Sequence, residues 1–311
     1  MSSPAKSADK IATSRDDVLS KFPGIVRSAA EAEARLAARA GAAVGGQLSL
    51  PFWAEQFRAL PSEIFRSALF NARNKTKARE HMKDREIVVI GPGTITYTGE
   101  ELRQDDETVW LQLIQLAKTQ PLGSPIQFTA NSFLKAIDWP VKSESYVRLR
   151  ACFTRMQATS LKVFAKRLGE ESGKALSMIP EFDWQDGETK RPLRRYVVRL
   201  APALVNLFGG QGHFTRVEWT QRLSLPDGLA RWLHGYFASH REPYPVKLET
   251  IRDGSGLTVE RIAHMRTLVE KALNELKRVK FLKDWKFQGP NKDLVIVERA
   301  NAPEPDLELT E

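Results

Sequence analysis

The feature that most constrains the fold of this chain is an order of predicted secondary-structure elements that occurs twice. In the second half, helical periodicity and turn residues predict helices over 226–239 and 247–253 and a long amphipathic helix over 258–280. A β-hairpin follows, with strands over 281–287 and 293–298. The first half predicts helices over 107–119, 129–138 and 143–158, then strands over 161–166, 175–182 and 193–200. The second half therefore repeats the plan of the first.

Two helices, a turn, a longer helix and a hairpin follow one another in a winged helix. We therefore expect an α+β protein with two tandem winged-helix domains, each a helix-turn-helix plus a β-hairpin. The first is expected over 61–200, with a further helix over 61–71 and a hairpin at 87–90 and 95–97. The second is expected over 201–299 and opens with a short helix over 202–208.

The two ends of the chain differ in composition from these domains. Residues 1–46 carry an Ala/Glu/Arg run with helical propensity but little to bury, which predicts a flexible, partly helical arm. Residues 47–60 are expected to form a linker. Residues 300–311 combine acidic residues with prolines and are expected to form a solvated acidic tail.

The charge of the chain indicates its class of partner. Lys and Arg number 47 against 38 Asp and Glu, which gives a formal net charge of +9. Such an excess favours a polyanion, nucleic acid first and an anionic membrane surface second. The single cysteine, Cys152, excludes an intrachain disulfide and a cysteine zinc site, and we interpret it as a buried apolar residue. Since no signal peptide or membrane span is evident, a cytoplasmic protein is expected.

The predicted helix over 258–280 is the main candidate for DNA recognition. Its apolar residues fall on one face, and its polar and basic residues fall on the opposite one. In a helix-turn-helix, the start of the second helix reaches base edges in the major groove. We expect Arg261, His264 and Arg266 to contact bases, and Lys271 and Arg278 to contact phosphates. The alternative is an ordinary solvated face of a core helix.

The matching helix over 143–158 lies in the most basic window of the predicted fold. Residues 142–167 hold seven basic residues and one acidic residue. Arg148 and Arg155 are expected on the face opposite the core, as DNA-backbone contacts. The run from Arg73 to Arg85, with several Lys and Arg residues, is either a further phosphate contact or a solvated loop.

Residues 47–52 (QLSLPF) resemble a short docking motif. A glutamine followed by alternating leucines and an aromatic residue is typical of bacterial sliding-clamp ligands, in the six-residue variant that contains Pro51. Gln47 would bind at the rim of a pocket on the clamp. Leu48, Leu50 and Phe52 would supply the apolar part. The alternative is that these side chains pack on the first domain.

Signals for an enzyme are absent from the sequence. There is no phosphate-binding loop of the Walker type and no His-x-His pair, and the five histidines are scattered. The acidic pairs near residues 100 and 105 are more typical of a helix N-terminus than of a metal site. We therefore expect no catalytic residue, no metal ion and no cofactor.

Four longer strings resemble one family. They are residues 67–74 (SALFNARN), 95–106 (ITYTGEELRQDD), 156–161 (MQATSL) and 239–250 (SHREPYPVKLET). They are similar to the TrfA replication initiators of broad-host-range plasmids, over about residues 47–299. The resemblance implies tandem winged helices that bind repeated origin sites (iterons) as monomers, the second domain reading the major groove and the first mainly contacting the backbone.

The resemblance also implies opening of an A/T-rich region, so that an opened strand becomes a ligand, and loading of the host replicative helicase with or without the host initiator. Dimers held through the first domain would be inactive, and the docking motif would bind the sliding clamp. Two other functions stay open. One is a winged-helix transcriptional repressor. The other is a nicking relaxase, which the missing histidine pair disfavours.

Overall fold

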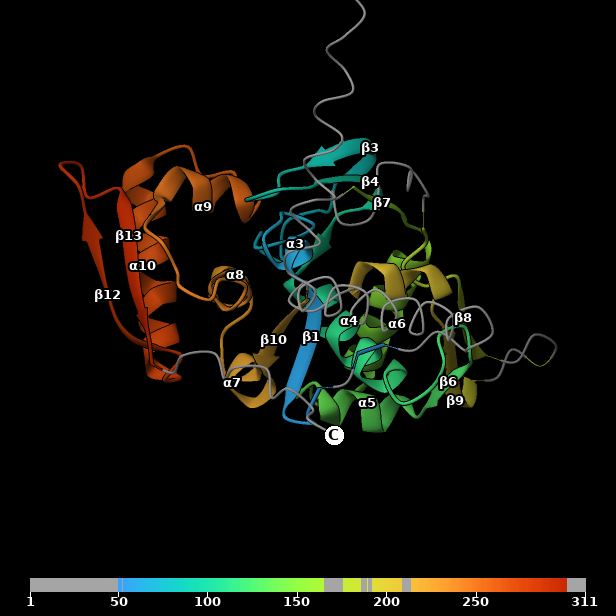
Figure 1. Ribbon diagram of the computed structural model, residues 1–311. Helices are drawn as coiled ribbons and strands as arrows, with labels where there is room; N and C mark the ends of the chain where they lie inside the picture. The colour runs from blue at the N-terminus through green and yellow to red at the C-terminus, as the bar shows by residue number, and fades with distance from the viewer. Residues whose placement is uncertain are drawn as a thin grey trace, which may run out of the picture. The chain divides into compact units, whose positions relative to one another are not determined.

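The computed structural model describes residues 50–51, 53–164, 176–185, 189, 192–208 and 214–300 (Figure 1). The predicted arm, Gln47, Leu48, Phe52 and residues 301–311 of the predicted tail lie outside these residues. No helix in the described part of the chain has the length and apolar character needed to cross a membrane.

The second half forms a winged helix (orange to red in Figure 1). Its elements, in chain order, are α8 (Leu229–Ala238), β11 (Val246–Lys247), α9 (Leu248–Gly254), α10 (Ile262–Arg278), β12 (Leu282–Gln288) and β13 (Leu294–Arg299). The three strands form an antiparallel sheet in the order β11-β13-β12, so the terminal hairpin is the wing.

The first half repeats this arrangement. The corresponding elements are α4 (Gln104–Ala117), β6 (Ile126–Phe128), α5 (Ala130–Ala136), α6 (Ser143–Gln157), β8 (Glu181–Gln185) and β9 (Pro192–Arg199). Their sheet has the order β6-β9-β8, which is the same topology. Two tandem winged helices in an α+β chain are thus confirmed.

The long helices α6 and α10 bury the same pattern of positions. Leu149, Cys152, Phe153 and Met156 of α6 match Val269, Ala272, Leu273 and Leu276 of α10 in spacing, and all are buried. A stripe with this spacing covers one side of a helix and packs it on the core. The two helices are therefore equivalent by packing as well as by chain order.

Further elements precede and connect the winged helices. They are β1 (Phe57–Pro61), α3 (Ser62–Phe65), β2 (Phe70–Asn71), β3 (His81–Ile87), β4 (Thr94–Glu100), β5 (Leu102–Arg103), β7 (Ser160–Phe164), the 3-10 helix η2 (Pro202–Phe208), β10 (Phe214–Glu218) and α7 (Trp219–Leu223). β3, β4 and β7 form one sheet, β2 pairs with β5 in parallel, and β1 pairs with β10.

Several predicted elements differ in the structure. The helix over 61–71 is only α3, because the backbone after it turns to other partners: Ala68 N–H donates to Val88 O, and Ile90 N–H donates to Arg66 O. The hairpin strand expected at 87–90 is β3, which ends at Ile87. The strand expected over 175–182 is β8, which begins at Glu181, and Leu176 makes only an isolated bridge to Leu161.

The division between the two cores also differs from the expected boundary at residue 200. Val217 and Trp219 still belong to the first core, whereas Leu225 and the buried apolar residues after it belong to the second core. The reason is that β10 pairs with β1, while Trp219 Nε1 donates to Ala136 O of α5 at 2.8 Å. Residues 57–60, expected in the linker, likewise belong to the largely buried strand β1.

Side chains of the two winged-helix regions meet across this division. Arg222 of α7 is fully buried and pairs with Glu107 of α4 at 3.2 Å. Arg231 of α8 donates to Thr108 Oγ1 at 3.1 Å. Gly235 of α8 lies directly against the Phe65 ring, so that a Cβ there would stand 2.3 Å from Phe65 Cδ1. Ion pairs and close packing both join the two regions.

The contact at Gly235 gives a prediction for stability. Gly235→Ala forces a methyl group against a buried ring and should lower the free energy of unfolding by about 1–3 kcal/mol, measured by urea denaturation. Phe65→Leu in the same chain should recover part of the loss, because it removes the ring edge. An unchanged unfolding midpoint for Gly235→Ala would contradict the packing described here.

Candidate nucleic-acid interface

Helix α10 presents the basic face that the sequence predicts. It begins at Ile262, later than the expected Thr258, because Arg261 still has an extended backbone. Met265, Val269 and Leu273 are buried on one side, while Arg261, His264 and Lys271 are exposed on the other. These three side chains form no hydrogen bond or ion pair with the described part of the chain. They are therefore available to a ligand.

The other two predicted DNA contacts on α10 are engaged within the protein. Arg266 donates to the backbone oxygens of Asn291 at 2.6 Å and Lys292 at 3.2 Å, which ties the tip of the wing to the helix. Arg278 pairs with Glu275 at 2.8 Å and donates to Ser224 O at 2.6 Å. Arg266 holds the wing in place. Arg278 still exposes about half of its side chain.

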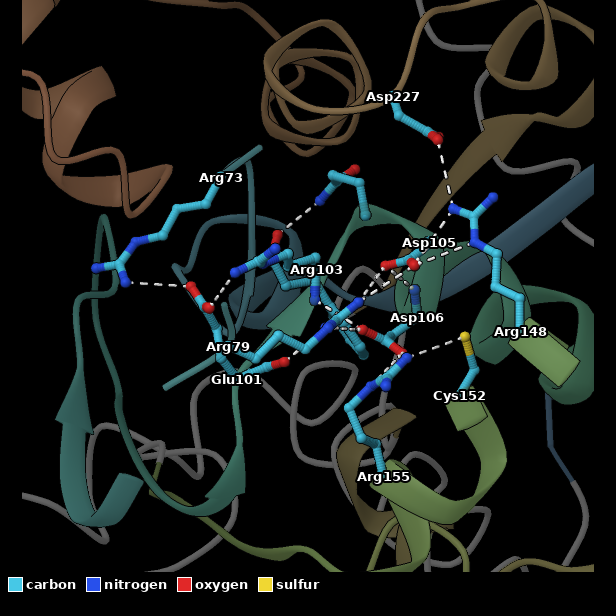
Figure 2. A network of polar contacts seen from close by, with 12 residues as sticks. Arg73, Arg79, Glu101, Arg103, Asp105, Asp106, Arg148, Cys152, Arg155 and Asp227 are labelled. Carbon is cyan, nitrogen blue, oxygen red and sulfur yellow. Dashed lines mark hydrogen bonds and ion pairs between the residues drawn. The ribbon is translucent and has the colours of Figure 1, made fainter. Parts of the chain in front are cut away.

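Arg148 and Arg155 of α6 do not lie on a free face, which corrects the expectation from the sequence. Figure 2 shows both guanidinium groups directed at Asp105 and Asp106, near the start of α4. Arg155 pairs with Asp106 at 2.9 Å and its side chain is only 12% exposed. Arg148 pairs with Asp105 at 3.2 Å and Asp227 at 3.6 Å and covers the Trp139 ring. Both positions flank the buried stripe of α6, where a long side chain reaches the neighbouring helix.

The outward face of α6 carries little charge. Its exposed residues include Ser143, Glu144, Val147 and Thr154. In the same domain, Arg194 and Arg195 of β9 are exposed. No sequence pattern singled out this adjacent arginine pair, although it lies inside a predicted wing strand. Free cations of the first domain therefore lie outside α6.

A compact ionic cluster surrounds the start of α4 (Figure 2). Besides Arg148 and Arg155, Arg79 contributes, pairing with Asp106 at 2.6 Å and Asp105 at 3.0 Å. Burial alone would raise the pKa of Asp105, but Arg79 and Arg148 hold that pKa below its ordinary value. Burial alone would lower the pKa of Arg155, but Asp106 raises it above its ordinary value. Burial and the neighbouring Asp105 raise the pKa of Asp106, although Arg155 and Arg79 oppose that rise. Each carboxylate of the pair lies against at least one guanidinium group.

A cleft of about 890 Å³ runs beside this cluster. Its lining includes Arg261 at the N-terminus of α10, His264 and Lys271 of α10, Lys75 and Lys77 of the loop before β3, and Arg148 of α6. Arg148 and Arg261 thus border the same cleft, although Arg148 is held by its carboxylate partners. The cleft joins the predicted basic run of residues 73–85 to the recognition helix.

Leu50 is the one apolar residue of the predicted docking motif that the structure describes. It is only 6% exposed and belongs to the first core, beside Trp53. Trp53 Nε1 in turn donates to Gln115 of α4 at 2.6 Å. Leu50 therefore packs on the first domain, as the alternative interpretation expected.

No set of three or more His, Cys, Asp or Glu side chains among the described residues is placed to hold a metal ion. The carboxylates of the acidic cluster at α4 form ion pairs with arginines, as Figure 2 shows. Cys152 is buried beside it, and burial raises the pKa of its thiol well above the ordinary value.

The positions of Arg155 and Arg148 predict a structural effect. Arg155→Ala leaves the buried Asp106 carboxylate with one cation fewer and should cost about 3–5 kcal/mol of unfolding free energy in urea denaturation. Thr154→Ala, on the exposed side of the same helix, should change it by less than about 0.5 kcal/mol. If the Arg155→Ala protein were as stable as the unaltered chain but bound DNA more weakly, Arg155 would be a DNA contact after all.

This chain is similar to known proteins in sequence and in structure. A plasmid replication initiator protein TrfA of Escherichia coli is 37% identical over 227 residues, which are 72% of this chain and 58% of that protein. Domains 2 and 3 of RctB share 12% identity and superpose with a TM-score of 0.51 over 77% of this chain and 99% of theirs, a likeness of fold. The Pi initiator protein in complex with iteron DNA aligns over 68% of this chain and 100% of its own, with 12% identity and a TM-score of 0.45.

The sequence profile described as TrfA protein covers most of the chain. It matches residues 43–299, which include both winged helices and the elements between them. The chain belongs to the TrfA family.

Proposed function

We propose that this protein is a plasmid replication initiator that binds iterons, the directly repeated sites of an origin, as a monomer. The observation that carries the proposal is the exposed basic side of α10 in the recognition-helix position of a winged helix. Membership of the TrfA family and 37% identity to a replication initiator support it. The proposal involves no catalytic site, metal ion or cofactor. It places the protein in the cytoplasm, with DNA.

In this proposal α10 enters the major groove with its N-terminal part foremost. Arg261 and His264 contact base edges there, since they stand at the first turn and are exposed. Lys271 and the exposed part of Arg278 contact phosphates further along the helix. Arg266 acts indirectly, because its hydrogen bonds to Asn291 and Lys292 hold the wing beside the groove.

Arg261→Ala tests the base contact. Binding to an origin repeat should weaken by about 1–3 kcal/mol, because a bidentate base contact is lost, while binding to a scrambled duplex should change little. Fluorescence anisotropy with both duplexes measures this. Lys271→Ala is the matched control in the same helix and should weaken both duplexes by the same factor. Equal losses from Arg261→Ala would remove its role in reading sequence.

The later steps of initiation belong to the same proposal. By family membership, the bound protein would open an A/T-rich tract, contact the opened strand, and recruit the host replicative helicase, with or without the host initiator. Dimers through the first domain would be the inactive form. A winged-helix repressor would bind the same sites without opening them, so permanganate reactivity of thymines beside the bound repeats separates these two functions.

The sliding clamp is a further proposed partner, through Gln47, Leu48 and Phe52. Gln47→Ala combined with Phe52→Ala should reduce clamp pull-down at least tenfold, because Gln47 and Phe52 would supply the rim hydrogen bond and the aromatic anchor. Leu50→Ala is a less direct test, since Leu50 belongs to the first core and its truncation should destabilise the fold. Retained pull-down by the double variant, with unchanged stability, would contradict the clamp proposal.

A further inference from the structure

The loop of residues 73–78 presents two lysines to the cleft opposite α10. Lys75 and Lys77 are exposed and line the cleft together with Arg261, His264 and Lys271. Within the described residues, neither ammonium group has a hydrogen bond or an ion pair. Two free cations from this loop thus share the lining of one cleft with the cations of the recognition helix.

A buried arginine, Arg103, fixes the backbone of this loop through hydrogen bonds to its carbonyl groups. Arg103 donates to Asn74 O at 2.7 Å, to Lys77 O at 2.9 Å and to Ala78 O at 3.0 Å. Its own charge is balanced by Glu101 at 2.6 Å, a fully buried carboxylate. Three carbonyls held by one guanidinium group leave the loop little freedom.

Further contacts fix the first part of the loop. Asn74 Oδ1 accepts from the backbone N–H and the hydroxyl of Thr76, at 3.0 and 3.1 Å. Arg73 donates to Gly256 O at 2.8 Å and pairs with Glu101 at 3.2 Å (Figure 2). The loop backbone is therefore ordered before any ligand arrives, so binding there costs little ordering entropy.

The charges around the cleft favour an anion. Asp105 and Asp227 border it, but Arg148 pairs with both and Arg231 also pairs with Asp227. Of the remaining acids, Glu275 is held by Arg278, and Glu260 stands alone against the lysines and Arg261. The uncompensated charges are mainly positive, and they come both from the loop of residues 73–78 and from the recognition helix with its N-terminal residue.

We propose that Lys75 and Lys77 form a phosphate-binding loop, which holds the sugar–phosphate backbone of the duplex whose bases α10 reads. Lysine suits this role as a compact charge without base preference. The proposal rests on the proposed function, since it needs duplex DNA on α10. It assigns the backbone contact of the first half of the chain to two named lysines outside α6, in place of Arg148 and Arg155.

The test measures the salt dependence of binding by the full chain. The probe is a 30-base-pair duplex selected from a random library by the full-length protein, with a scrambled duplex beside it. The slope of log affinity against log KCl should fall by about 0.9 for Lys75→Ala, for Lys77→Ala, and twice that for the double variant. For both duplexes, the loss of affinity that each single substitution causes should therefore be about eightfold larger in 0.1 M KCl than in 1 M KCl.

Lys83→Ala is the matched control, because Lys83 is an exposed lysine of β3 outside the cleft. Its slope should equal that of the unaltered chain. An unchanged slope in the double variant, or a loss confined to the selected duplex, would overturn the phosphate-binding loop. If the random library yields no preferred sequence, the proposed function itself fails, and the two failures are thereby distinguished.

Two further arms identify the source of the phosphate. A single-stranded oligonucleotide of the same length and inorganic triphosphate are compared with the duplex, on the unaltered chain and the double variant. A lysine-dependent loss for the duplex supports the proposal. For triphosphate, binding is read as a thermal shift. If the double variant loses affinity only for the single strand, or loses only the thermal shift with triphosphate, the loop binds another phosphate ligand and the proposal is overturned.

Discussion

The ionic cluster at the start of α4 is the interaction on which most of the structure depends. Asp105 and Asp106 lie in the first turn of the helix, where carboxylates interact favourably with the helix dipole, and both are buried. Buried carboxylates are tolerable only when paired, and arginines from two separate segments supply the pairing: Arg79 from the loop before β3, and Arg148 and Arg155 from α6. One turn of helix thereby fixes the segment before β3 and the whole of α6, and through Asp227 it reaches the second winged helix.

The repeat shows how one framework can support two different surfaces. Helices α6 and α10 bury the same pattern of positions, and their sheets have the same strand order. Outside that shared pattern they differ: α10 leaves His264 and Lys271, and Arg261 at its N-terminus, without a partner among the described residues, whereas two arginines of α6 pair with internal carboxylates. In the first half, free cations lie instead on the loop of residues 73–78 and on β9.

The sequence was sufficient to predict the elements with strong periodicity. The helices over 107–119, 143–158 and 258–280 and the final hairpin all appear close to their expected positions, because their apolar stripes extend over several turns or strand residues. Short elements such as β1, β10 and α7 were missed, since their partners lie far away in the chain. The site was half predicted. A helical wheel places Arg155 beside the apolar stripe of α6, but it cannot show that the buried carboxylate of Asp106 on α4 lies within reach of the guanidinium group.

The pairing of β1 with β10 has a consequence for the order of folding during synthesis. Phe57 pairs with Glu218 and Pro61 with Phe214, so a strand made early must wait for one made more than a hundred and fifty residues later. Contacts of such separation form late, because a long loop must close first. Until β10 has been translated, the edge of β1 that pairs with it carries backbone N–H and C=O groups without a partner strand. A nascent chain stalled before residue 214 should therefore be a substrate for chaperones and proteases.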